Sequence, residues 1–174
     1  MASQSFKIFK PRYPEFISVL KQCLGLIKDH DIGNHQFNPD GQLAIQTTGS
    51  NDWHDGIGAG RSTAFNEEKF QHLQSSLVGT PVDNYLKWLG VDVYRTRLML
   101  AKPKSCYSIH KDFTPRLHLP LITNDQCHFL FTDPERLIHM PADGKTYWID
   151  TRVSHTFLNG SIFDRYHLVM IVKE

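Results

Sequence analysis

The sequence predicts one mainly β domain of the α+β class, in which a jelly-roll-like β-fold is buttressed by helices near the N-terminus. Two observations lead to this prediction. Helical periodicity dominates the front part, about residues 1–90, whereas about 91–174 is a series of short apolar runs separated by turn residues. A chain of 174 residues suits a single domain, because a chain of this size buries roughly 70 % of its unfolded surface without disulfide staples.

Three segments of the front part have helical patterns. The first runs from Tyr13 to Lys28, and Pro14 lies where a first helical turn accepts proline. Apolar residues recur in it at helical spacing, namely Phe16, Val19, Leu20, Cys23, Leu24 and Ile27. A second helix is predicted from Asn66 to Leu77, and a third from Val82 to Leu89, which Gly90 ends.

The strands are predicted from short runs bounded by Pro, Gly, Asn or Asp. One candidate, Leu43–Thr47, lies in the front part. The others follow residue 90: Val91–Ala101, Ser108–Asp112, Arg116–Ile122, Cys127–Thr132, Leu137–Met140, Thr146–Asp150, Val153–Leu158 and Phe163–Val172. The end of the last run, Tyr166–Val172, is apolar on both faces. We therefore expect the barrel interior to cover one face and an N-terminal helix to cover the other.

Charge and cysteine content argue against several classes of protein. Nineteen basic and eighteen acidic side chains give a net charge of +1, so we expect neither a nucleic-acid partner nor a membrane surface. Cys23, Cys106 and Cys127 show no C-x-x-C spacing, which favours reduced thiols in the cytoplasm. The polar start of the chain has no signal-peptide core, and no apolar run approaches the ~18 residues that span a bilayer.

His110 and Asp112 form a candidate metal-binding pair. On a strand, residues i and i+2 point to the same face, so the imidazole and the carboxylate can reach one ion. A histidine from a distant strand would complete a facial triad of two histidines and one carboxylate, which leaves positions open on iron(II). In a chain with ten histidines such a pair also arises by chance. The alternative is a histidine at a loop edge beside a surface aspartate.

The surroundings of this pair favour the metal interpretation. Arg116 and His118 form another i, i+2 pair, and Arg165 follows His155 by ten residues at the start of the last strand. The planar fork of an arginine can grip one carboxylate of a dicarboxylate and leave the other end free to chelate a metal. The alternative for Arg165 is a salt bridge at the barrel end, with Asp164 or Asp150.

Three segments together resemble the aspartyl/asparaginyl β-hydroxylase family of iron(II)/2-oxoglutarate-dependent dioxygenases. They are His110-Lys-Asp-Phe-Thr-Pro-Arg-Leu-His118, Trp148-Ile-Asp-Thr-Arg-Val-Ser-His155-Thr-Phe-Leu-Asn159 and Asp164-Arg165-Tyr-His-Leu168. The resemblance covers roughly Tyr94 to Val172. It implies a double-stranded β-helix, cupin-like in shape. It also implies Fe²⁺ as cofactor and 2-oxoglutarate as co-substrate.

Position by position, the resemblance makes His110 and His155 metal ligands and makes Arg116, His118 and Arg165 contacts of 2-oxoglutarate. The vertebrate aspartyl hydroxylase of the family lacks the acid of the triad, whereas this chain has Asp112. In this respect the chain is more similar to bacterial members that hydroxylate free amino acids, such as proline hydroxylases. The implied reaction hydroxylates a C–H bond and yields succinate and CO₂.

The substrate is not identified by these motifs, and an amino acid, a short peptide and a protein side chain all fit them. The main alternative is a non-catalytic cupin-like module that binds a metal or ligand; another is a jelly-roll metal isomerase or a dioxygenase without 2-oxoglutarate. Candidate substrate contacts are Trp53, His54, Arg97 and Trp148. Packing on the core is the alternative for Trp53 and the favoured interpretation for Trp148, and Arg97 is equally interpretable as solvent-facing. His128, His139 and His167 are interpreted as packed core histidines.

Two structural expectations concern loops. The glycine-rich segment from Gly49 to Gly60 is predicted to be a mobile lid over the metal site. Asn159-Gly160 favours a tight hairpin turn. However, His155 and Arg165 would face one cavity only if their strands paired across an odd-length or bulged connection. We therefore predict such a connection.

Overall fold

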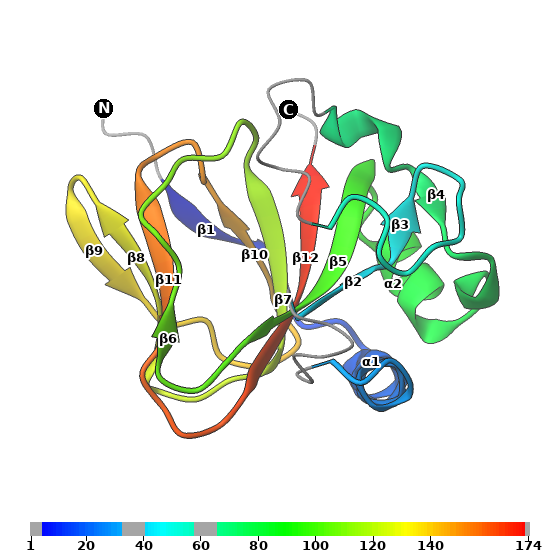
Figure 1. The fold of residues 1–174 in the computed structure, drawn as a ribbon, viewed down its shortest axis with the longest axis horizontal. Coiled ribbons are helices and arrows are strands. Elements are labelled where there is room, and N and C mark those ends of the chain that lie inside the picture. Colours follow the sequence, from blue (N-terminus) through cyan, green and yellow to red (C-terminus); the bar gives the residue numbers. More distant parts are fainter. Residues whose placement is uncertain (1–4, 33–40, 58–65, 173–174) are drawn as a thin grey trace.

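A computed structural model describes residues 5–32, 41–57 and 66–172, and it is mainly β (Figure 1). Helices α1 (Phe16–Asp29) and α2 (Pro81–Trp88) form where two of the three helices are predicted. The strands are β1 (Phe6–Lys10), β2 (Gln42–Ala44), β3 (Gln46–Thr47), β4 (His72–Leu73), β5 (Val93–Ala101), β6 (Ser105–Cys106), β7 (Arg116–Ile122), β8 (Cys127–Thr132), β9 (Glu135–Ile138), β10 (Thr146–Ile149), β11 (His155–Asn159) and β12 (Arg165–Val172).

Two antiparallel sheets face each other, as a jelly roll requires (Figure 1). The larger has the strand order β1-β10-β7-β12-β5-β2, and the smaller has the order β6-β11-β8-β9. The front part is not only helical, because β1 and β2 join the larger sheet at its two edges. No helix in the described part of the chain is long and apolar enough to cross a membrane.

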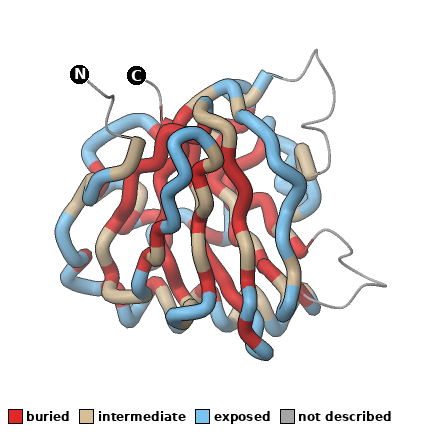
Figure 2. Tube along the Cα trace, turned by 90° about the vertical axis from the view of Figure 1, so that its left-hand side faces the viewer, coloured by how far each residue is buried: buried red, intermediate tan, exposed pale blue. Residues whose placement is uncertain are grey.

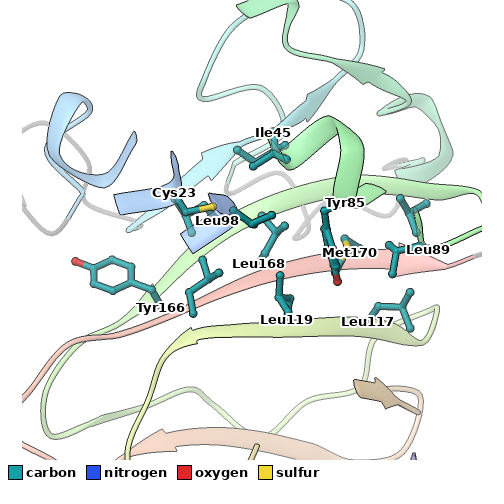
Figure 3. Packing of buried hydrophobic residues seen from close by; sticks show 14 of the residues in the cluster. Cys23, Ile45, Tyr85, Leu89, Leu98, Leu117, Leu119, Tyr166, Leu168 and Met170 are labelled. Carbon is teal, nitrogen blue, oxygen red and sulfur yellow. The ribbon is translucent and has the colours of Figure 1, made fainter. Parts of the chain in front are cut away.

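The larger sheet separates an apolar layer from the space between the sheets. Leu168 of β12 lies opposite Leu98 of β5 and Leu119 of β7, and all three are fully buried (Figure 3). On α1, Phe16 and Cys23 reach the same cluster. Since side chains alternate along a strand, the neighbours of Leu168 project to the other side, between the sheets. The tube in Figure 2 shows buried residues running along the strands and exposed ones gathering in the connections.

The helix predicted from Asn66 to Leu77 does not form. Two 3₁₀ turns replace it, η2 (Glu67–Lys69) and η3 (Ser75–Leu77), with β4 between them. The side chain of Gln74 donates to Ala44 O at 2.9 Å, and its backbone N–H donates to Ile45 O at 3.0 Å. These contacts with a neighbouring strand compete successfully with the local helical preference, because tertiary contacts override weak propensity.

Two predictions about strands near the site are also wrong. Ser108–Asp112 is not a strand, although His110 forms an isolated antiparallel bridge with His155. The strands β11 and β12 do not pair at all, because they belong to different sheets. The connection between them is held by Asn159, whose Nδ2 donates to Ala101 O at 3.0 Å and to Phe163 O at 2.8 Å. His155 and Arg165 thus lie on facing sheets and line the same interior space, and they are not paired along a hairpin.

Candidate metal centre

His110, Asp112 and His155 come together at one end of the space between the sheets. Their candidate ligand atoms all lie within 4.8 Å of one another. Each carboxylate oxygen of Asp112 is 3.9 Å from one imidazole, Oδ1 from Nε2 of His110 and Oδ2 from Nε2 of His155. The His110 side chain is 41 % exposed and that of His155 is 4 % exposed. The group therefore lies at the entrance of the interior, with one ligand reachable from solvent.

Backbone hydrogen bonds fix these three residues relative to one another. His110 and His155 exchange both of their backbone hydrogen bonds, at 3.0 and 2.9 Å, and the N–H of Asp112 donates to Thr151 O at 2.8 Å. The Nδ1 atoms of His110 and His155 lie 2.7 and 2.8 Å from the carbonyls of Ser108 and Val153. A carbonyl only accepts, so each Nδ1 carries a proton, and Nε2 is the atom of each ring that can offer a lone pair to a metal.

The charge state of His155 suits this role. Burial lowers its pKa, although the Val153 carbonyl and the Asp112 carboxylate oppose that effect. The ring of Phe129 stacks on it, with centroids 4.8 Å apart and planes at 16°. His155 is therefore held as a neutral ring between an aromatic wall and the carboxylate.

A cavity of about 150 Å³ extends inward from these ligands. The residues that line it come from both sheets and from the segment that carries His110. They are Arg95, Arg97, Met99, Tyr107, His110, Asp112, Arg116, His118, Phe129, Thr151, His155, Phe157, Arg165, Val169, Met170 and Ile171. The predicted metal ligands and the predicted 2-oxoglutarate contacts Arg116, His118 and Arg165 thus face one space.

Glu67 binds two of the arginines and was not identified from the sequence. Its Oε1 accepts from Arg95 Nη1 at 2.7 Å and from Arg116 Nη2 at 2.9 Å, and its Oε2 accepts from Thr114 at 2.9 Å. Burial alone would raise the pKa of Glu67, but Arg116, Arg95 and Thr114 lower it below 4.5. Arg95 has a left-handed φ of 47°, a strained conformation for a non-glycine residue.

Replacing Glu67 with glutamine is expected to lower the free energy of unfolding by about 1–3 kcal/mol, because two largely buried guanidinium groups would lose their shared carboxylate. The pKa of Glu67 is lower in the folded state, so its contribution is present above about pH 4.5 and is lost as pH falls below that value. Urea unfolding at pH 7 and at pH 3 measures both effects. The exposed Glu135→Gln provides the control, and an equal deficit at both pH values would contradict the assignment.

Arg116 is already engaged by acidic groups. Besides Glu67, its Nη2 lies 3.5 Å from Oδ1 of Asp112, and its Nη1 donates to the backbone and hydroxyl oxygens of Thr114. This guanidinium orients the Asp112 carboxylate toward the histidines. Its contact with a co-substrate, which the resemblance implies, would have to share the group with both carboxylates.

Arg165 differs from Arg116 because it has no carboxylate partner among the residues that the structure describes. Asp164 instead accepts from Tyr166, and Asp150 pairs with Arg152 at 2.7 Å, so neither forms the alternative salt bridge. The guanidinium lies over the ring of Phe157, 3.5 Å from its centroid. Burial lowers the pKa of Arg165 to about 9, so the group is charged at neutral pH.

Two buried histidines adjoin Arg165. Its Nη2 donates to Nδ1 of His167, which lies 3.4 Å from Nδ1 of His118. Burial and the charge of Arg165 lower the pKa of both rings well below 6.5, so both are neutral. The Nε2 atoms of His118 and His167 and the Nε of Arg165 have no hydrogen-bond partner within the described residues. His167 is a core histidine, as predicted, but it also fixes the arginine.

Of the four predicted substrate contacts, Arg97 lines the cavity and the other three do not. Trp53 packs against the large apolar cluster, with its ring centroid 4.4 Å from that of His30. His54 lies beside Asp52 at 3.7 Å on the surface. Trp148 is buried in the same large cluster. The aromatic residues are packing residues, which was the alternative interpretation.

The predicted lid is described only in part, since residues 58–60 lie outside the described ranges. The described portion is tied down by Asp55, whose Oδ2 accepts from Thr48 N at 2.7 Å and from Ser50 Oγ at 2.8 Å. These hydrogen bonds lower the pKa of Asp55 against the effect of burial. These hydrogen bonds therefore close the segment from Thr48 to Asp55 into a turn.

Comparison with known proteins places the fold. No protein-family model matches the sequence, and no curated protein matches it. Among solved structures, AviO1 from Streptomyces viridochromogenes Tue57 has a TM-score of 0.57 at 14 % identity, over 98 % of this chain and 90 % of that one. A Pseudomonas putida prolyl-4-hydroxylase has a TM-score of 0.51 at 14 % identity, over 99 % and 90 %. The nickel complex of ThoJ, a non-heme monooxygenase, has a TM-score of 0.55 at 13 % identity, over 98 % and 74 %. This chain therefore shares its overall fold with proteins described as a prolyl-4-hydroxylase and a non-heme monooxygenase.

Proposed function

We propose that this chain is an iron(II)- and 2-oxoglutarate-dependent dioxygenase that hydroxylates a C–H bond of an amino acid, a peptide or a protein side chain. The observation that carries the proposal is one cavity that is lined by the three candidate metal ligands and by a buried arginine. At one end, two imidazoles and a carboxylate converge, and at the other a buried arginine has no carboxylate partner among the described residues. Fold similarity to a prolyl-4-hydroxylase and to a non-heme monooxygenase supports it.

The three candidate ligands suit iron(II). Two imidazole nitrogens and one carboxylate oxygen are the donor set of non-heme iron oxygenases, and the free Nε2 lone pairs of His110 and His155 make both rings ready ligands. Late metals such as zinc or nickel would also bind these donors. When bound, the iron and 2-oxoglutarate would supply the oxidising chemistry, and succinate and CO₂ would be the co-products.

The protein supplies position and exclusion of water. Hydrogen bonds to Ser108 and Val153 hold the two imidazoles, and Arg116 orients Asp112. A buried guanidinium without an internal counter-charge is costly, and a carboxylate of 2-oxoglutarate would relieve that cost as a bidentate pair with Arg165. The ring of Phe129 shields His155 from water, and the ring of Phe157 shields Arg165.

The proposal predicts oxygen-dependent formation of succinate from 2-oxoglutarate when the purified protein is supplied with iron(II), even without a known substrate. A background of uncoupled turnover is sufficient, and it must disappear without oxygen or with a chelator. Protein that binds the metal but forms no succinate with 2-oxoglutarate and oxygen would be a cupin-like binding module instead. Metal content and succinate, measured on one preparation, separate these outcomes.

A further inference from the structure

The four arginines that line the cavity fall into two pairs. Arg95 and Arg116 both donate to Glu67. Arg165 and Arg97 have no carboxylate partner within the described residues. The Nη1 of Arg97 donates instead to the neutral amide oxygen of Gln42, at 2.6 Å. The cavity therefore presents two cations that no acidic side chain of the described chain neutralises.

These two cations lie at different places along the larger sheet. Arg97 of β5 is opposite Val169 of β12, and Val169 is opposite His118 of β7. Arg165 is opposite Ala101 of β5. Ala101 lies four residues beyond Arg97 on that strand, which corresponds to about 13 Å of backbone at 3.3 Å per residue. Arg97 thus lies level with Val169 and His118 on the neighbouring strands, whereas Arg165 belongs to a separate cross-strand pair with Ala101. The two arginines therefore leave the sheet at separate places, which allows each of them to bind its own anionic group.

The overall charge of the site supports a second anion. Among the residues that the structure describes, four arginines stand against two carboxylates, Asp112 and Glu67, which leaves an excess of two positive charges. A divalent metal and the dianion of 2-oxoglutarate cancel each other, so the excess persists after both have bound. Walls of one sign in a poorly hydrated cavity attract ligands of the opposite sign.

We propose that the substrate carries an anionic group, a carboxylate or a phosphate, and that Arg97 binds it. This inference rests on the proposed function, since it assigns Arg165 to 2-oxoglutarate. Gln42 holds one side of the Arg97 guanidinium toward the sheet edge and leaves its remaining N–H groups for the ligand. Arg97 lies on a strand, and this gives it a more fixed position than a loop residue would have.

The test measures binding to the protein loaded with zinc and 2-oxoglutarate in the absence of oxygen. The probes are matched pairs: each protein amino acid and its carboxamide, and each O-phosphorylated amino acid and its hydroxyl parent. The readout is the rise in unfolding temperature, which depends on ligand concentration relative to Kd. We expect anionic members to stabilise the protein and their neutral partners not to do so. Whether the acids or the phosphates bind identifies the group.

Arg97→Gln is expected to weaken binding of the anionic probes by about 10- to 150-fold, the range for a hydrogen bond to a charged group. Arg97→Lys should retain part of the affinity, which excludes a folding defect as the cause. The exposed Arg136→Gln, on β9 outside the cavity, should bind like the wild type.

Three results would overturn the inference while leaving the proposed function intact: equal binding of neutral partners, an anion preference that survives Arg97→Gln, or no anionic binder on protein that has bound 2-oxoglutarate. Failure of the proposed function has a different signature, because the protein would then show neither stabilisation by 2-oxoglutarate nor succinate formation. The two failures are therefore read from separate measurements.

Discussion

Asp112→Ala is expected to abolish succinate formation and to lower the affinity for iron(II) by at least about 100-fold. Asp112 would supply the one anionic ligand, and its two oxygens lie 3.9 Å from the two imidazole nitrogens. Substitutions of groups that only orient a metal ligand already cost 10- to 100-fold in metal affinity or activity, so loss of a ligand should cost more. Metal affinity by competition with a chelating dye and succinate by mass spectrometry measure the two effects.

The control for this variant is Asp125→Ala, which changes an exposed carboxylate in a turn. Removing Asp112 also deprives Arg116 of one neighbour, but Glu67 still holds that guanidinium at 2.9 Å. The fold should therefore survive, and the unfolding temperature of the metal-free variant verifies this. Wild-type metal affinity in a folded Asp112→Ala protein would mean that the ion binds elsewhere.

The metal group was predictable from the sequence because it depends on short spacings and on a resemblance in three segments. His110 and Asp112 do converge with His155, although not for the reason that strand parity gave. No regular strand carries His110. An isolated bridge to His155 and the hydrogen bond from Asp112 to Thr151 align the two side chains instead. The three residues lie together as predicted, but the predicted strand over Ser108–Asp112 does not form.

Glu67 shows what the sequence could not reveal. It lies in a segment with helical periodicity, and its partners Arg95 and Arg116 are 28 and 49 residues away. Nothing in the local pattern distinguishes this glutamate from a solvated helix residue. Edge strand β1 was missed for a similar reason, because it pairs with β10, which is distant from it in the sequence.

The connection after His155 was misjudged because the strands on either side of it were assumed to pair with each other, whereas they belong to different sheets. Asn-Gly favours a two-residue hairpin, but Asn159 is buried and its amide satisfies backbone groups on both sides of the crossing between sheets. Its Oδ1 also accepts from Ser161 Oγ at 2.7 Å. Side-chain hydrogen bonds of this kind offer the backbone an alternative to a ladder. His155 and Arg165 nevertheless line one cavity, because strands of facing sheets can share an interior without pairing with each other.

Arg165→Leu is expected to raise the KM for 2-oxoglutarate by roughly 30- to several-thousand-fold, the cost of truncating a buried charged partner. Iron(II) affinity should stay close to wild type, since no contact joins Arg165 to the three candidate ligands in the described structure. The metal-free variant should be as stable as the wild type or more so. It replaces a buried cation that has no carboxylate partner among the described residues with an apolar side chain over Phe157. Weaker binding of 2-oxoglutarate without a loss of stability distinguishes a ligand-binding arginine from a structural one.

The pH dependence supplies a second signature of the same residue. Burial lowers the pKa of Arg165 from 12.5 to about 9, so the unfolded chain binds the proton more tightly. The stability of the metal-free protein should therefore rise with pH above about 9, while its affinity for 2-oxoglutarate falls there. Arg165→Leu should lack both trends, and Arg136→Leu should keep them. An unchanged KM in Arg165→Leu would assign the co-substrate carboxylate to another group, and Arg116 would then be the residue to replace, because it lines the same cavity beside Asp112.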